Sequence, residues 1–374
     1  MRSPLAHAAA LCAVFAFLFS CTRYFSPRPS APSDRESVET YAEFQRGFRP
    51  FRTSGGNAGG DAAPSESASD PAEKTYQHIR RLPDGYALDY GFLNFNGDAL
   101  EVRATLSDAI VAESVREFGF RDEDLQALDA WYQKAQKDSI DIAKGDSFSG
   151  KVTAKDQAEL ARKLQELKTK NAQVQKDLDA TLAALSVEYR RRRVELYQKA
   201  GFRYKNANTI EADVPSLARR NAPRMRSIVE AYSSIAGGRN YGSEELVGAV
   251  VAMAQTAVRY EIPPNRAGTK VTGGILPPPK TLVLGQGDCD TKTALIASIL
   301  RSWPNVKTVG LEIPEHYLMA VHRVPRKGEV YIEYEGKPYL LIESAGPAWL
   351  PPGQVGDYTM SYLESGKQFA IQPI

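Results

Sequence analysis

A cysteine follows a glycine-rich turn in the stretch Gly285-Gln286-Gly287-Asp288-Cys289-Asp290-Thr291-Lys292-Thr293-Ala294-Leu295. The apolar residues from there on are spaced as on one side of a helix: Leu295, Ile296, Ile299, Leu300 and Trp303. Asp288 is a typical N-cap residue, so Cys289 is expected at or near the first helical position. The helix dipole there favours thiolate and can lower a thiol pKa from about 8.5 towards neutral. The same backbone N–H groups can stabilise an oxyanion.

A nucleophilic cysteine needs a base, and the base needs a group that orients it. Two of the four histidines follow Cys289: His316 begins a strand-like apolar run, and His322 ends it. Their spacing of six residues would place both on one face of a regular strand. Residues 339–342 form a second buried-strand pattern that ends in Glu343. We expect His316 to be the base, and His322 remains its rival.

Three segments in this order resemble the transglutaminase-like superfamily of papain-type thiol enzymes, in its bacterial branch. They are the nucleophile motif at residues 285–295, the histidine strand at 315–321, and the hairpin and strand that lead to the acid at 336–344. The loop at residues 272–282 is also similar to the one that this branch places before its cysteine. The resemblance covers about residues 244–346 of the chain.

The resemblance implies acyl transfer through a thioester, with Cys289 as nucleophile, His316 as base and Glu343 as the acid that orients it. The acid is commonly Asp in this family, so Glu343 is a departure. We expect a hydrolase, a protease or amidase, and transfer to an amine remains the alternative. Gln286 is a candidate side-chain donor to the oxyanion, whereas Asp288 and Asp290 are expected to be structural or capping residues. No residues have the spacing of a zinc site, so no metal and no cofactor is expected.

The predicted fold class is α+β, with the Cys289 helix packed on an antiparallel sheet. Strands are expected at residues 306–313, 316–324, 330–334 and 339–343, and an irregular tail from 347 to 374. We expect a transglutaminase-like catalytic domain at residues 241–374. A mainly helical region at 76–240 precedes it, with a small β unit whose turn is Asn96-Gly97.

Residues 1–21 have the features of a signal peptide. Arg2 supplies the positive start, and the apolar run at 8–19 is too short to span a bilayer as a helix. Leu18-Phe19-Ser20-Cys21 resembles a lipobox, which predicts lipidation of Cys21 and anchoring to a membrane of the bacterial envelope, facing the periplasm or in the outer membrane. Plain secretion and an uncleaved anchor are the alternatives. Residues 22–75, rich in Ser, Pro, Gly and Ala, are expected to be a disordered linker.

A heptad-like pattern predicts one long helix at residues 153–199. Three arrangements fit it: a hairpin with the preceding helix, self-association as a coiled coil, and docking to another protein. Asn171 falls in the apolar seam, where a buried Asn can fix register or partner number. The four arginines that begin at Arg190 are expected on a solvated face, with contact to anionic lipid or cell-wall polymer as an alternative.

The composition limits the class of partner. The formal net charge is +2 over 374 residues, which gives no argument for nucleic acid. The expected substrate is a protein or peptide, with peptidoglycan cross-bridges also open. A hypothesis from another class is an inactive transglutaminase-like scaffold that uses its long helix in envelope assembly.

Overall fold

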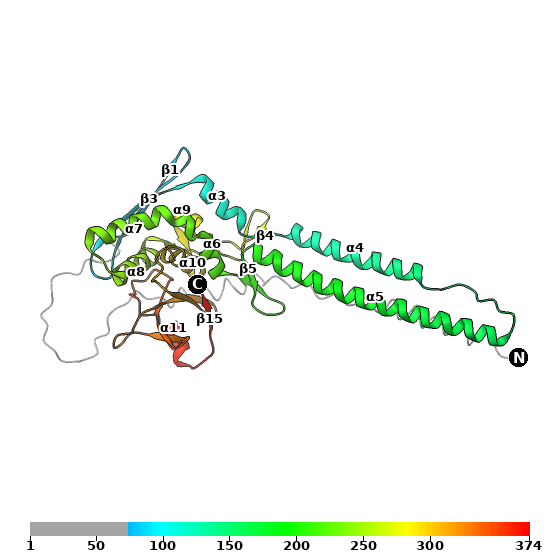
Figure 1. Cartoon of the computed structure of the whole chain (residues 1–374). Coiled ribbons are helices and arrows are strands. Elements are labelled where there is room, and N and C mark those ends of the chain that lie inside the picture. The colour runs from blue at the N-terminus through cyan, green and yellow to red at the C-terminus, as the bar shows by residue number, and fades with distance from the viewer. Residues whose placement is uncertain (1–73) are drawn as a thin grey trace. The chain divides into compact units, whose positions relative to one another are not determined.

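The computed structural model describes residues 74–374, and its largest sheet has five antiparallel strands (Figure 1). The strand order is β13-β14-β12-β11-β15. The fold is therefore mixed, with helices and an antiparallel sheet, as α+β predicts. The four expected strands are present, and their bounds are β11 Thr308–Ile313, β12 His316–His322, β13 Tyr331–Tyr334 and β14 Lys337–Ile342.

The C-terminal tail is not irregular, so the prediction for residues 347–374 was wrong. It contains a helix, α11 at Asp357–Glu364, and the fifth strand, β15 at Ala370–Pro373. β15 pairs with β11, and Gln372 lies opposite Gly310. A four-residue strand is too short for a recognisable pattern, and main-chain pairing with β11 defines it instead.

Helix α10, Cys289–Leu300, packs on β12 and is buried along almost its whole length. A helix that is apolar on most sides must be enclosed by other elements. The elements in contact with it include α6 Val214–Asn221, the 3-10 helix η3 Ala222–Met225, α8 Ser243–Ala252, the π-helix η4 Met253–Ala257 and α9 Pro278–Leu284. The other short helices are α3 Asp108–Glu117 and α7 Arg226–Arg239.

A three-stranded N-terminal sheet packs into the same core. Its strands are β1 Tyr76–Leu82, β2 Gly85–Leu93 and β3 Ala99–Ser107, and the predicted turn at Gly97 joins the last two. Leu88 of β2 belongs to one apolar cluster with Ile296 of α10 and Met319 of β12. Contacts therefore cross residue 240, where the sequence suggested a boundary, and residues 74–205 and 210–374 belong to one compact unit.

Short strands connect the larger elements. Two pair in parallel, β7 Arg259–Tyr260 with β10 Gln286–Gly287. The others pair antiparallel: β5 Phe202–Tyr204 with β6 Ile210–Ala212, and β9 Lys270–Val271 with both β4 Phe120–Arg121 and β8 Arg266–Ala267.

The long helix forms a hairpin with the helix before it. α4 spans Asp122–Asp146, and α5 spans Gln157–Lys199 (Figure 1). Tyr132 and Tyr189 stack at 4.5 Å between ring centres, and the Tyr189 hydroxyl donates to Asp129 at 2.6 Å. The hairpin arrangement is confirmed. α5 begins later than predicted because Asp156 caps it by accepting the backbone N–H of Glu159 at 2.8 Å.

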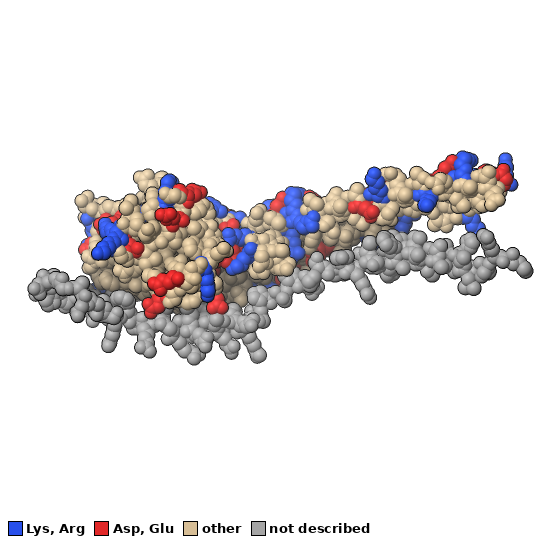
Figure 2. Space-filling view, turned by 90° about the horizontal axis from the view of Figure 1, so that it is seen from below, with Lys and Arg blue, Asp and Glu red and all other residues tan. Residues whose placement is uncertain are grey.

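Asn171 does not face a partner helix. Its side chain accepts the backbone N–H of Phe148 at 2.9 Å and donates to the carbonyl of the same residue at 3.2 Å. It therefore fixes the loop between α4 and α5. Within the arginine run, Arg191 pairs with Glu188 at 2.7 Å, and Arg192 stacks 3.9 Å from the ring centre of Trp131. Charges of both signs are scattered over the face in Figure 2.

The predicted signal peptide, Cys21 and nearly all of the predicted linker lie outside the described residues. Within residues 74–374, no helix is long and apolar enough to cross a membrane.

The packing of the α4–α5 hairpin predicts that the change from Leu to Ala affects stability unequally at two positions of α5. Leu178 of α5 is 8% exposed, whereas Leu164 of the same helix is 49% exposed. We expect Leu178→Ala to lower the free energy of unfolding by about 2–3 kcal/mol, because it leaves a cavity in the seam. The matched Leu164→Ala variant should change it by less than about 1 kcal/mol. Hydrogen exchange of α4 and α5 amides measures both, and equal protection in the two variants would contradict the packing described.

Candidate active site

The turn before Cys289 is built against the N-terminal sheet. Gly285 follows α9 in the left-handed region, at φ 64°, where a side chain is unfavourable. A β-carbon at this position would lie 1.8 Å from Oε1 of Gln77 in β1. The next two residues form β10 beside β7. Two strands distant in sequence therefore fix the loop that delivers the cysteine.

Cys289 is the first residue of α10, as predicted. Asp288 is its N-cap, and Oδ1 of Asp288 accepts the backbone N–H of Thr291 at 3.1 Å. The thiol donates to Oδ1 of Asp290 across 3.4 Å. Only 1% of Cys289 is exposed, so its thiol is enclosed by protein.

His316 and Glu343 form a buried pair where β12 begins and β14 ends. Nε2 of His316 lies 2.7 Å from Oε1 of Glu343, and the two side chains are 1% and 2% exposed. The second carboxylate oxygen accepts a hydrogen bond from Thr359 at 3.2 Å. Thr359 lies in α11, in the tail that was predicted to be irregular, so no local pattern pointed to it.

Pairing shifts the pKa of His316 and the pKa of Glu343 in the directions that favour their charged forms. Burial works against the imidazolium, but the neighbouring Glu343 raises the pKa of His316 above its ordinary value. Burial also works against the carboxylate, but His316 and the hydroxyl of Thr359 hold the pKa of Glu343 below its ordinary value. Each group therefore stabilises the charge of the other in the protein interior.

One buried hydroxyl joins the backbone around all three residues. Oγ of Ser344 lies 3.4 Å from the carbonyl oxygen of Cys289 and 3.4 Å from that of Tyr317. Ser344 follows Glu343 in the chain, and Tyr317 follows His316. The structure therefore brings Cys289, His316 and Glu343 together. A serine after a strand has no sequence signal of its own, and the prediction missed it.

Charged side chains of α10 surround the cysteine. Burial, with a smaller contribution from Asp290, raises the pKa of Asp288 to about 7. Burial also raises the pKa of Asp290, and it lowers the pKa of Lys292 to about 7. Two of these pKa values lie near 7, so the charge around Cys289 changes with pH near neutrality.

The hydrogen bond that Asp288 accepts from Thr291 confirms its predicted capping role.

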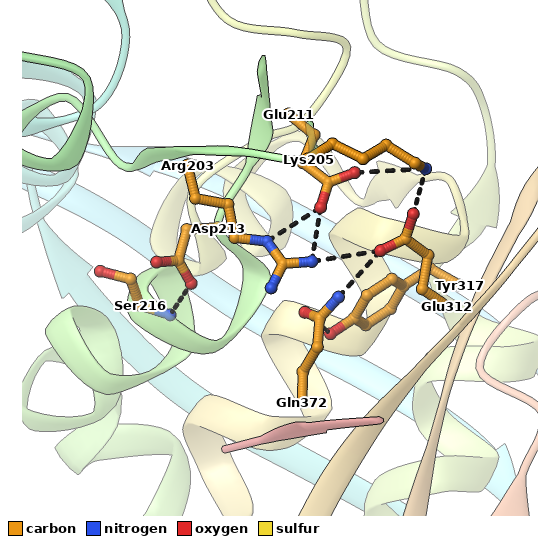
Figure 3. A network of polar contacts seen from close by, with 8 residues as sticks. All are labelled: Arg203, Lys205, Glu211, Asp213, Ser216, Glu312, Tyr317 and Gln372. Atoms are coloured by element: carbon orange, nitrogen blue, oxygen red, sulfur yellow. Dashed lines mark hydrogen bonds and ion pairs between the residues drawn. The ribbon is translucent and has the colours of Figure 1, made fainter. Parts of the chain in front are cut away.

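A polar network joins the β5–β6 hairpin, which follows α5, to the sheet of His316 (Figure 3). Arg203 of β5 donates to Oε2 of Glu312 at 3.1 Å, and Gln372 of β15 donates to the same oxygen at 3.0 Å. Gln372 also accepts the hydroxyl of Tyr317 at 2.7 Å. Because Tyr317 directly follows His316, this network holds the start of β12 in place.

The other candidate residues lie apart or are engaged elsewhere. His322 is exposed at the opposite end of β12, 2.9 Å from the carbonyl oxygen of Pro338, and six residues of strand extend about 20 Å. It is therefore not placed to serve Cys289. Oε1 of Gln286 accepts a hydrogen bond from Arg259 at 3.2 Å, and its role at the oxyanion remains a prediction.

Among the residues that the structure describes, no group of three or more His, Cys, Asp or Glu side chains is arranged to hold a metal ion. Comparison of the chain with models of protein families, with curated proteins and with solved structures finds no match.

The conformation of Gly285 predicts a large effect of one methyl group. Gly285→Ala should lower the free energy of unfolding by about 1–3 kcal/mol, because it combines a left-handed alanine with the contact to Gln77. The control Gly237→Ala adds the same methyl group inside α7, where nothing lies within 4 Å, and should stabilise by about 0.5–1 kcal/mol. Urea unfolding compares them, and equal effects would contradict the left-handed conformation of Gly285.

The buried pair predicts a pH window of stability. The pKa of Glu343 is lowered, so its contribution is present above about pH 4.3 and is lost as pH falls through the folded value. The pKa of His316 is raised, so its contribution is present below about pH 6.5 and is lost as pH rises through the folded value. The stability difference between wild type and Glu343→Gln should therefore be largest between these limits. A difference that is constant from about pH 3.5 to 8.5 would contradict the pairing.

Proposed function

We propose that this chain is a transglutaminase-like thiol hydrolase, a protease or amidase that acts through a thioester at Cys289. The carrying observation is the buried His316–Glu343 pair, which lies beside a cysteine at the first position of a helix. An inert buried cysteine needs neither feature. The transglutaminase-like fold is part of the proposal, and a nucleophile helix followed by an antiparallel sheet supports it.

The two nitrogens of His316 have different tasks in this reaction. Nε2 faces Glu343, so Nδ1 is the nitrogen that takes the thiol proton. The thiolate then attacks the amide carbonyl carbon, and the carbonyl electron pair moves onto oxygen. Backbone N–H groups at the first turn of α10 stabilise this oxyanion. When the intermediate collapses, the C–N bond breaks and the imidazolium protonates the leaving amine.

Hydrolysis completes the cycle. Water loses a proton to His316 and attacks the thioester, which releases the carboxylic acid and returns the proton to the thiolate. An amine in place of water would make the same site a transferase. We prefer hydrolysis because the sequence resembles the bacterial branch. The substrate class is a protein or peptide of the cell envelope, with peptidoglycan peptides included, since residues 1–21 suggest export and lipidation at Cys21.

The pH dependence of cysteine alkylation tests this proposal. The rate of iodoacetamide reaction is followed by mass spectrometry on the peptide that contains Cys289, so Cys12 and Cys21 do not contribute. Burial of the sulfur slows the reaction at every pH, whereas ionisation sets the midpoint of the profile. We expect a midpoint below about pH 7 in wild type, shifted upward in His316→Ala and to a smaller extent in Glu343→Gln.

His322→Ala is the matched control, because it removes an imidazole from the same strand away from the site. It should keep the wild-type midpoint. A wild-type midpoint near about pH 8.5 that no variant changes would refute the catalytic proposal.

The scaffold hypothesis is the second candidate. It is favoured by apolar side chains exposed on the α4–α5 hairpin, where Ile142 is 66%, Val187 58% and Leu164 49% exposed. Under this hypothesis the protein functions by self-association or by docking to another protein through this hairpin. Under this hypothesis Cys289→Ala has no phenotype in the native cell, whereas removal of the hairpin does. Loss of function in Cys289→Ala would eliminate it.

A further inference from the structure

Lys292 lies one turn after Cys289 in α10, with its ammonium group enclosed by protein. The residue is 0% exposed, and Nζ has no hydrogen-bond partner among the described residues. Lysine side chains normally extend their charged end into water, because a buried charge without a partner is costly. Some electrostatic gain must offset the placement of this ammonium group.

Side chains on a helix lean towards its N-terminus, so Lys292 points back at Asp288 and Cys289, four and three residues before it. Its Nζ lies 5.8 Å from the ring centre of Tyr260, which follows η4. Gly346 is also close, because a β-carbon on this residue would be 3.1 Å from Nζ. The ammonium group is therefore held between the first turn of α10, β7 and the loop that follows the acid.

The charges at this place do not balance without Lys292. Four acidic groups meet around the first turn of α10, namely Asp288, Cys289, Asp290 and Glu343, and the bases that face them are His316 and Lys292. The nearby Arg203 and Lys205 pair with Glu211 and Glu312. The raised pKa values of Asp288 and Asp290 make these two groups the ones that stay protonated most readily. The two positive charges then match the Cys289 thiolate and the Glu343 carboxylate.

We propose that Lys292 is a positioning residue for the nucleophile, whose buried ammonium group stabilises the Cys289 thiolate from inside the helix. His316 then serves chiefly to move protons, and Lys292 in its charged form places a positive charge beside the sulfur. Because Lys292 is enclosed, it acts through Cys289 and does not touch substrate. This inference rests on the proposed function, since it concerns the ionisation of the same thiol.

The test compares alkylation profiles of wild type, Lys292→Met and Lys280→Met. Methionine fills nearly the same volume without charge, and Lys280 carries the same side chain on the neighbouring helix α9. We expect Lys292→Met to raise the midpoint by about one pH unit, which makes alkylation roughly tenfold slower below the midpoint. Lys280→Met should leave the midpoint unchanged. The melting temperature of Lys292→Met is measured beside the alkylation profile, to separate a loss of stability from a change in the ionisation of the thiol.

The outcomes separate the two proposals. A low midpoint in wild type that Lys292→Met leaves unchanged overturns the role of Lys292 and keeps the thiol enzyme. A wild-type midpoint near about pH 8.5 overturns the proposed function itself. A variant that melts earlier with an unchanged midpoint shows that Lys292 is only structural.

A second measurement needs no substitution, in case Lys292→Met does not fold. Coupled titrations are reciprocal, so removal of the thiolate by carbamidomethylation must lower the pKa of Lys292. Carbon-13 chemical shifts of labelled lysine side chains, recorded against pH, should show one lysine that titrates near neutrality. Its midpoint should move down after Cys289 is alkylated. A midpoint that does not move overturns the inference.

Discussion

The site depends on one buried interaction, the contact of 2.7 Å between His316 and Glu343. Neither charge would be stable alone in this interior, because burial disfavours the charged form of each. Together they lie at the edge where β12 begins and β14 ends. The hydroxyl of Thr359 donates a hydrogen bond to the second carboxylate oxygen of Glu343. The sheet therefore delivers an oriented imidazole to the place where α10 presents its first residue.

Elements far apart in sequence hold this arrangement. The N-terminal sheet touches the cysteine loop through Gln77 and Gly285, and Tyr90 of β2 donates to the carbonyl of Leu282 in α9. On the other side, the network of Arg203 and Glu312 connects the end of the helical hairpin to the start of β12. Residues 76–240 thus contribute directly to the geometry of a site whose proposed reacting groups all come later in the chain.

The sequence predicted what depends on local pattern. Asp288 before an apolar helix placed Cys289 at the first helical position, and strand-like runs placed His316 and Glu343 at strand ends. It could not predict what depends on tertiary contact. Thr359 and Ser344 are ordinary residues until folding brings them to the acid and the cysteine, and β15 is defined by its neighbour. The burial of Lys292 was not predicted, because nothing in the local pattern indicates that α10 is enclosed.

The central claim is that Cys289, assisted by His316, forms an acyl-enzyme. The most direct measurement is rapid mixing of the protein with p-nitrophenyl acetate, followed by mass spectrometry of the quenched sample. The account predicts a burst of nitrophenolate stoichiometric with protein, an acetyl group on the peptide that contains Cys289, and loss of both in His316→Ala. The absence of both the burst and the acetyl group on Cys289, or a burst that persists in His316→Ala, would contradict it.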